Sequence, residues 1–261
     1  MCNLAQICVN EYIANACKGE EKMVQLDLEK LNKEYSDKSP EDIVRFVVEN
    51  IGIEKVALAS SLSIEDQVLT DILLKINPKV RVFFLDTGRH FQQTYDLMEE
   101  TMHRYGFHYE VYAPESKELE QAVSKYGPNF FYESVELRKK CCEIRKVNPL
   151  KRVLSTVDAW ICGLRREQSL TRQELNIFEW DGLHSIYKIN PIVFWSEDRV
   201  WEYIKKYNIP YNSLYSKGFR SIGCQPCTRA VRPGEDVRSG RWWWEDPDKK
   251  ECGLHARVGQ V

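Results

Sequence analysis

Short apolar segments alternate with longer segments of helical periodicity between residues 56 and 126. The apolar segments have the length of strands and cover residues 56–60 (VALAS), 80–85 (VRVFFL) and 108–113 (HYEVYA). Apolar residues at helical spacing follow each of them, over residues 65–76, 91–105 and 117–126. Strands and helices that alternate in this way form βαβ units with right-handed crossovers. We therefore predict an α/β fold with a doubly wound, mostly parallel sheet flanked by helices.

The remaining sequence predicts a single domain with an extension at each end. Residues 1–52 are predicted to be a helical N-terminal segment, in which Ser39 and Pro40 begin a helix that Gly52 ends. Residues 53–228 are predicted to form the α/β domain, including a further buried strand at 159–163 (AWICG) and a helix capped by Ser196. Residues 229–261 are rich in Gly, Arg and Trp and are predicted to be a mobile C-terminal tail that carries the catalytic thiol.

Charge and composition exclude several classes of partner. The formal net charge of −2 predicts no general affinity for nucleic acid or acidic membranes. No apolar run approaches the ~20 residues of a transmembrane helix, and the N-terminus lacks the pattern of a signal peptide. We expect a cytoplasmic protein, in which the nine cysteines serve as metal ligands or catalytic thiols and not as disulfides. The sequence predicts no particular oligomeric state, and a homo-oligomer is one of the alternatives.

Two loops at predicted strand ends carry chemistry that suits a nucleotide. The first is Ser60-Ser61-Leu62-Ser63-Ile64-Glu65-Asp66 and the second is Asp86-Thr87-Gly88-Arg89-His90. Ligands of doubly wound sheets bind beyond the carboxyl ends of the strands, where hydroxyls and backbone N–H groups before a helix can meet phosphate or ribose. The same residues are also ordinary helix caps, and the loops lack the glycines of a Walker A or Rossmann motif.

Four cysteines form two pairs that could ligate one metal centre. They are Cys141, Cys142, Cys224 and Cys227. Four thiolates suit either a zinc ion or a [4Fe–4S] cluster, and adjacent cysteines favour the cluster because its irons occupy a larger volume. Two other readings remain: buried small hydrophobes for the adjacent pair, and a redox dithiol for the Cys-x-x-Cys pair.

The C-terminal region combines a thiol with many cations. Cys252 precedes His255 by three residues, and Arg229, Arg232, Arg238 and Arg241 lie upstream. Nearby cations favour the reactive thiolate, and arginines bind anions through paired hydrogen bonds. Lys146 follows Cys142 by about one helical turn, which would place it between the cysteines and an anionic substrate. The alternatives are a polar tail with an incidental thiol and a solvated basic helix face.

In their order along the chain, these motifs resemble those of assimilatory adenylylsulfate reductases, within the wider group of phosphoadenylylsulfate reductases and adenine-nucleotide α-hydrolase-like folds. The resemblance covers most of the chain, from about residue 56 to residue 255. The matching motifs are SSLSIED (60–66), LDTGR (85–89), CCEIRK (141–146), GLRREQS (163–169) with Thr171-Arg172, GCQPC (223–227), RSGRWWW (238–244) and ECGLH (251–255).

The resemblance implies a thioredoxin-dependent oxidoreductase of sulfate assimilation and cysteine biosynthesis. The four cysteines would ligate one [4Fe–4S] cluster that shapes the site electrostatically. Cys252 would attack the sulfur of adenosine 5′-phosphosulfate, AMP would leave, and thioredoxin or glutaredoxin would release sulfite from the S-sulfonated Cys252. Lys146 and His255 would assist catalysis. The substrate-binding residues would be Ser60, Ser61, Ser63, Glu65, Asp66, Leu85, Asp86, Thr87, Gly88, Arg89, Arg165, Arg166, Gln168, Arg172, Arg238 and Arg241.

Three alternatives remain at this point. The first is the same chemistry on 3′-phosphoadenylylsulfate, or on both nucleotides, although such reductases typically lack the cluster cysteines. The second is an ATP-pyrophosphatase-type tRNA thiolase, which would need a Ser-Gly-Gly-x-Asp-Ser loop that the residues from Ser61 to Asp66 do not provide. The third is a zinc-binding interaction module without catalytic activity.

Overall fold

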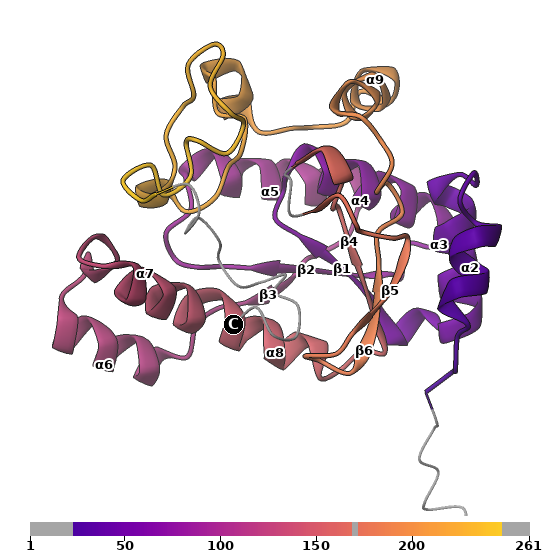
Figure 1. The fold of residues 1–261 in the computed structure, drawn as a ribbon, viewed down its shortest axis with the longest axis horizontal. Helices are drawn as coiled ribbons and strands as arrows, with labels where there is room; N and C mark the ends of the chain where they lie inside the picture. The colour runs from indigo at the N-terminus through magenta and orange to yellow at the C-terminus, as the bar shows by residue number, and fades with distance from the viewer. Residues whose placement is uncertain (1–22, 169–171, 247–261) are drawn as a thin grey trace, which may run out of the picture.

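The computed structural model describes residues 23–168 and 172–246, and its centre is a single six-stranded sheet (Figure 1). The strands follow the order β3-β2-β1-β4-β6-β5, and all neighbours pair in parallel except β5 and β6. The predicted fold class, a mostly parallel α/β sheet flanked by helices, is confirmed. The strands are β1 Val56–Ser60, β2 Arg81–Leu85, β3 Glu110–Tyr112, β4 Ala159–Cys162, β5 Phe178–Asp181 and β6 Ile186–Ile189.

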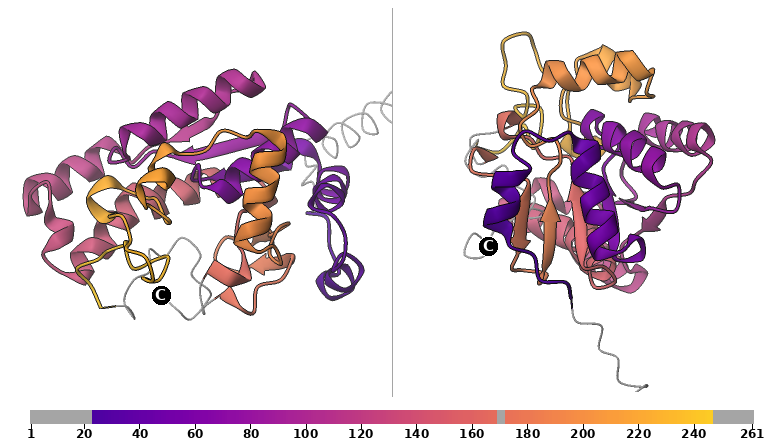
Figure 2. Two further views of the ribbon diagram at one scale, coloured as in Figure 1. Left: turned by 90° about the horizontal axis from the view of Figure 1, so that it is seen from above. Right: turned by 90° about the vertical axis from the view of Figure 1, so that its right-hand side faces the viewer.

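Helices cover both faces of the sheet, as its apolar strands require. Helices α3, α4 and α5 lie on one face, and α6, α7 and α8 lie toward the other (Figures 1 and 2). Leu58 of β1 and Ile161 of β4 pair at the centre and are fully buried. The helices are α2 Leu28–Glu34, α3 Pro40–Ile51, α4 Ile64–Ile76, α5 Gln92–Tyr105, α6 Ser116–Tyr126, α7 Val135–Cys142, α8 Asn148–Leu154 and α9 Glu197–Tyr207.

The predicted helix starts are confirmed by their capping contacts. Ser39 caps α3 in a reciprocal capping box with Asp42, and Ser196 caps α9 by accepting from the Arg199 N–H. Ser63 caps α4, the helix that follows β1, by accepting from the Asp66 N–H. The first loop therefore delivers its polar residues directly to the carboxyl end of β1. Within the described ranges, no helix combines the length and apolar character that crossing a bilayer requires.

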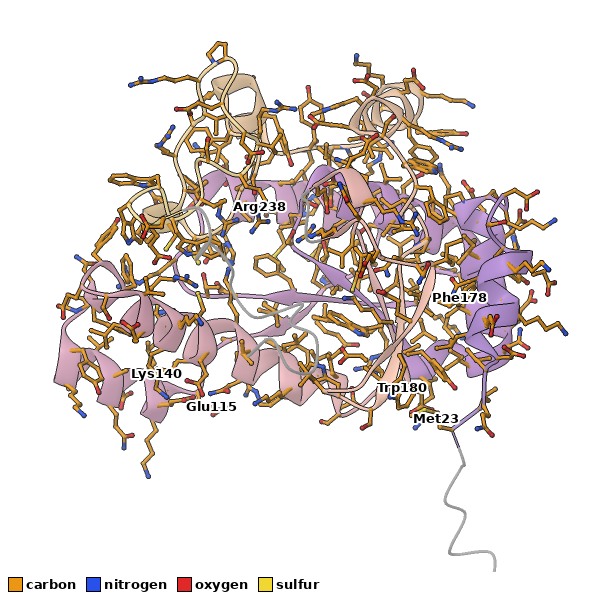
Figure 3. The ribbon with its side chains drawn as sticks, in the orientation of Figure 1. Met23, Glu115, Lys140, Phe178, Trp180 and Arg238 are labelled. Carbon is orange, nitrogen blue, oxygen red and sulfur yellow. The ribbon has the colours of Figure 1, made fainter. Side chains whose placement is uncertain are left out.

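The hairpin β5–β6 was not predicted. Residues 182–185 form the four-residue loop that joins the two strands, and β5 has only four residues and an exposed Trp180. The outer edge of β5 is protected by α2, because the Asn32 carboxamide both accepts from the N–H and donates to the carbonyl of Phe178, which Figure 3 labels. An open strand edge is prone to pair with other chains, and at Phe178 the Asn32 carboxamide occupies both backbone groups that could form such a pair.

A π-helical turn, Glu143–Val147, joins α7 to α8. Pro149 has no N–H to donate to the carbonyl four residues earlier, and its ring would clash there, which accounts for the irregular turn. Such turns widen a helix locally and are frequent at functional sites. Here the turn carries Arg145 and Lys146, directly after the paired cysteines of α7.

The last described segment folds back over the end of the molecule that carries α7, where it is drawn in yellow (Figures 1 and 2). The Gln225 N–H donates to the Arg89 carbonyl, and the Trp242 N–H donates to the Cys227 carbonyl at 3.0 Å. These bonds bring the Cys-x-x-Cys motif, in the short helix η7 Gln225–Cys227, to the loop after β2.

Candidate active site

A cavity of about 290 Å³ opens at the carboxyl ends of β1, β2 and β4, the position that the strand-end rule predicts for a ligand. Ser60, Leu85 and Cys162, the last residues of these three strands, line it. Segments distant in sequence supply the other walls. The predicted site residues on its lining are Ser60, Ser61, Ser63, Glu65, Asp66, Leu85, Lys146, Arg165, Gln168, Arg172, Arg238 and Arg241.

The loop after β1 forms a tight polar turn. Asp66 accepts two hydrogen bonds of 2.7 Å, from the N–H and from the hydroxyl of Ser61. Leu62 takes a positive φ of 60°, a conformation that favours glycine, while its side chain is buried. Burial raises the pKa of Asp66 to about 6, against the opposing effect of the Ser61 hydrogen bonds. A carboxyl group that titrates near neutral pH therefore faces the cavity.

Asp66→Asn is expected to change how stability depends on pH. The raised pKa in the folded state means that the contribution of Asp66 is complete below about pH 4 and is lost as pH rises through about 6. The unfolding free energy of the wild type should therefore fall relative to the variant by about 3 kcal/mol between pH 4 and pH 7. Urea unfolding across this range measures the difference, and parallel profiles would contradict the assignment.

A buried ion pair joins two of the segments that line the cavity. Arg165 Nε donates to Glu65 Oε1 at 2.9 Å, and both side chains are less than a tenth exposed. Gln168 donates to the same oxygen at 3.0 Å. Gly163 lies against this group, because a Cβ there would approach the Glu65 Cβ within 2.9 Å and would also overlap the Asp66 carboxylate. The loop after β4 thus packs directly on the first turn of α4.

Gly163→Ala is expected to weaken both folding and ligand binding. The added methyl must push Glu65 and Asp66 away from the positions that line the cavity. We expect a loss of about 1–3 kcal/mol in unfolding free energy, as is typical of overpacking, and about tenfold weaker nucleotide binding. Calorimetric titration with AMP and urea unfolding measure the two effects. Unchanged values for both would show that the loops adapt without cost.

Basic side chains enter the cavity from three separate segments. Lys146 comes from the π-helical turn, Arg172 from the loop after β4, and Arg238 and Arg241 from the C-terminal segment, where Figure 3 labels Arg238. Arg241 is only 8% exposed, its Nε has no hydrogen-bond partner among the described residues, and a Cβ on Gly223 would lie within 2.5 Å of its Cζ. Such a convergence suits a ligand with several negative charges.

The four paired cysteines lie beside this cavity. Cys141, Cys142, Cys224 and Cys227 belong to one buried cluster, and none forms a disulfide. Within residues 23–168 and 172–246, no three His, Cys, Asp or Glu side chains are placed as ligands of a single metal ion. The electrostatic surroundings of the thiols differ. Burial raises the pKa of Cys227 to about 12, whereas at Cys224 the effect of burial is outweighed by Lys146, Thr87, Arg241 and Arg145, which lower its pKa.

The loop after β2 points toward the cysteines more than toward the cavity. Thr87 is buried and accepts from the Cys224 thiol at 3.3 Å, while its carbonyl accepts from Arg145. Gly88 and Arg89 line a second, more open hollow of about 720 Å³. Asp86 accepts from the Tyr95 hydroxyl at 2.8 Å. These four predicted substrate-binding residues do not line the 290 Å³ cavity.

Arg166, the remaining predicted residue of this group, turns away from the cavity. Its Nε donates to the Leu175 carbonyl, and its guanidinium stacks on Phe194 at 4.6 Å. Its position is set by packing after β4, not by the ligand cavity. Cys252 and His255, the predicted nucleophile and its neighbour, lie outside the described residues.

Sequence reasoning did not single out several residues of the site. His90 lines the cavity and contacts the Leu85 carbonyl through Nε2 at 3.1 Å. Burial lowers its pKa to about 4, with a further contribution from Lys146, so its imidazole is neutral at neutral pH. Arg220 and Glu197 form an ion pair at the cavity, and the buried Tyr215 hydroxyl contacts the Ile64 N–H. Only the position of His90 at the end of a predicted nucleotide loop could have indicated it.

Comparisons with known proteins show which family the chain resembles. Residues 55–230 match the family model described as the phosphoadenosine phosphosulfate reductase domain. The chain is 49% identical over 205 residues to the adenosine 5′-phosphosulfate reductase of Allochromatium vinosum, covering 78% of this chain and 80% of that protein. It is 50% identical over 202 residues to the enzyme of the same name from Burkholderia cepacia, covering 77% and 81%.

A solved structure resembles the whole sheet and its helices. The phosphoadenylyl-sulfate reductase of Candida auris, determined as a phosphate complex, superposes with a TM-score of 0.68 at 29% identity. The match covers 80% of this chain and 99% of that one. Yeast FAD synthetase, with a TM-score of 0.50 at 13% identity, shares only the fold.

Proposed function

Because this chain belongs to the phosphoadenosine phosphosulfate reductase family, we propose that it reduces adenosine 5′-phosphosulfate to sulfite and AMP. The observation that carries the proposal is the convergence of Lys146, Arg238 and Arg241 on a cavity at the strand ends, beside four buried cysteines. Relatives about 50% identical over most of their length are named for this substrate. The activity would serve sulfate assimilation and cysteine biosynthesis in a reducing cytoplasm, where the free thiols persist.

The proposed nucleophile is the thiolate of Cys252. It attacks the sulfur of the sulfuryl group, so that a sulfur–sulfur bond forms while the sulfur–oxygen bond to the phosphate breaks. AMP leaves with the electron pair of that bond, and Cys252 carries the sulfonate. A thiolate of thioredoxin or glutaredoxin then attacks Cys252 Sγ, and sulfite leaves with the electron pair of the sulfur–sulfur bond. The second thiol of the reductant resolves the mixed disulfide.

The basic residues of the cavity would stabilise the departing phosphate. Charge develops on the phosphate oxygen as the bond to sulfur breaks, and cations that are already in place act on it without reorganisation. Lys146, Arg172, Arg238 and Arg241 are the candidates, and His255 would lie near the sulfate or Cys252. The Arg165–Glu65 pair would instead hold the loops around the nucleotide.

The cysteine cluster fits an iron–sulfur cofactor in its chemistry. Four thiols of the soft type that binds iron–sulfur clusters are buried together, and Lys146, Arg241 and Arg145 lower the pKa of one of them, Cys224. Arg145 Nε, buried among them, has no hydrogen-bond partner in the described structure and could donate to an anionic group held there. Cys141, Cys142, Cys224 and Cys227 would hold a [4Fe–4S] cluster, which would supply a fixed electrostatic field next to the cavity.

One experiment tests the proposed reaction directly. Protein purified without oxygen is mixed with adenosine 5′-phosphosulfate in the absence of reductant, digested, and examined by mass spectrometry. A sulfonate adduct confined to the peptide that contains Cys252, with one AMP released per adduct, is the expected result. Sulfite formation without an adduct would contradict the thiol mechanism. Iron analysis and visible absorption of the same sample test the cofactor, because four-thiolate zinc would leave the protein colourless.

A second candidate function is the same reaction on the 3′-phosphorylated nucleotide, or on both. The similarity to the Candida auris phosphoadenylyl-sulfate reductase supports it. The ratio of kcat/KM for the two nucleotides separates the candidates. A ratio strongly in favour of adenosine 5′-phosphosulfate is expected here, because the four paired cysteines are a feature that the reductases of the 3′-phosphorylated nucleotide typically lack.

A further inference from the structure

A buried ion pair joins the cysteine-bearing helix to the root of the C-terminal tail. Arg138 of α7 donates from Nε and from a terminal nitrogen to the two oxygens of Glu245, at 2.9 and 2.8 Å. The exposed fractions of the two side chains are 0% and 3%. The partners are separated by 107 residues, and Glu245 lies seven residues before Cys252. The pair therefore joins the helix that carries Cys141 and Cys142 to a residue only seven positions before the proposed nucleophile.

Trp242 completes this contact. Its ring centroid lies 4.7 Å from the Arg138 guanidinium and 4.9 Å from that of Arg241, and its side chain is almost fully buried. Its backbone takes a positive φ of 40°, a strained conformation for a non-glycine residue. Such strain persists only where the surroundings fix it, and it clusters at functional sites. Here the Trp242 N–H donates to the Cys227 carbonyl, and its ring contacts Arg138 on the helix that carries Cys141 and Cys142.

Stability alone is a weak reason for such a pair. Removing two charges from water costs about as much as their attraction returns, so that apolar residues of similar size are often equally stable. A bidentate pair does, however, impose one geometry, since the guanidinium and the carboxylate match in a single plane. We propose that the Arg138–Glu245 pair is a latch that fixes the root of the tail and thereby positions Cys252 for attack. This inference rests on the proposed function.

The length of the tail shows why a fixed root matters. Seven residues from Glu245 to Cys252 span at most about 25 Å when fully extended. If the latch opens, the next anchor is Trp242, ten residues from Cys252. The longer tether alone lowers the effective concentration of the thiol less than about twofold, because that concentration falls roughly as the −3/2 power of length. A larger decrease in the sulfonation rate would show that the thiol has lost its orientation toward the substrate, a loss that can change a rate by about 10²-fold.

The test replaces the pair by apolar residues of similar size, Arg138→Met with Glu245→Leu. The matched control is Arg81→Met with Glu110→Leu, which removes another bidentate pair at the amino end of β2, away from the cavity. The rate of S-sulfonation of Cys252 is measured in a single turnover at saturating adenosine 5′-phosphosulfate. The affinity for AMP and the visible absorption are measured in parallel, because a general loss of structure would change them.

The latch variant is expected to sulfonate Cys252 about tenfold or more slowly, while its affinity for AMP stays within about twofold of the wild type. The control should match the wild type in all three measurements. Glu245→Gln keeps the shape of the side chain and one hydrogen bond from the Arg138 guanidinium but loses the negative charge. It should give an intermediate rate, and it serves as the test if the double variant fails to fold. Rates within twofold of the wild type for both latch variants would overturn the proposal.

Hydrogen exchange tests the latch independently of whether the proposed reaction occurs. The Glu245 amide donates to the Trp242 carbonyl, and loss of the pair should make exchange at residues 242–245 about tenfold faster. If the wild type forms no adduct, the proposed function fails, but the latch is still judged by exchange. Unchanged exchange in the latch variants would overturn it independently.

Discussion

Cys252→Ser is expected to lower the rate of sulfite release by about 10⁴-fold or more, the loss typical of removing an enzyme's nucleophile. A serine hydroxyl is a far weaker nucleophile at neutral pH, and it cannot form the sulfur–sulfur bond that the reductant must break. The variant should bind AMP as the wild type does, because the basic side chains that line the cavity are unchanged. Turnover with reduced thioredoxin and mass spectrometry of the C-terminal peptide measure the effect.

The matched control for this change is Cys8→Ser. Cys8 is a cysteine outside residues 55–230, the part of the chain that matches the family, and no role is proposed for it. It should retain full activity and a sulfonate adduct on Cys252. If Cys252→Ser still turned over substrate, or if the adduct formed elsewhere, a different thiol would be the nucleophile and the role assigned to the tail would be wrong.

Local periodicity was sufficient to predict most of the sheet. Strands β1, β2 and β4 are continuous apolar runs because both of their faces are covered by helices, and β3 follows at the spacing of a further βαβ unit. The hairpin β5–β6 escaped prediction because β5 is short and its edge is completed by Asn32, a contact across 146 residues that no local pattern encodes.

The strand-end rule predicted where the cavity lies but not which side chains enter it. The residues from Ser60 to Asp66, except the buried Leu62, line it because α4 begins there, with Ser63 as its cap. The next loop, after β2, turns toward Cys224 instead, since the Thr87 hydroxyl and the Arg89 carbonyl are engaged by the C-terminal segment. That segment joins the fold more than a hundred residues later, so sequence spacing could not show which way the loop faces.

Lys146 connects the two halves of the site. It lines the cavity, and its charge lowers the pKa values of both Cys224, in the cysteine cluster, and His90, on the cavity lining. The π-helical turn places it there, one turn beyond Cys142. A cation held between buried cysteines and an anionic ligand offsets negative charge on both. Its stabilising effect is largest when negative charge shifts toward the phosphate during the reaction.

Lys146→Met is therefore expected to lower kcat/KM by about 10²–10³-fold, or about 3–4 kcal/mol of transition-state stabilisation. The affinity for AMP should fall much less, because the charge is needed most in the transition state. Lys140→Met is the matched control: Lys140 of α7, labelled in Figure 3, is about half exposed and forms a surface ion pair with Glu143. Equal activity of the two variants would mean that Lys146 is an ordinary solvent-facing residue of its helix with no role in catalysis. A loss confined to Lys146→Met, with visible absorption intact, would instead place the cation at the reacting phosphate, because the cysteine cluster would be unaffected.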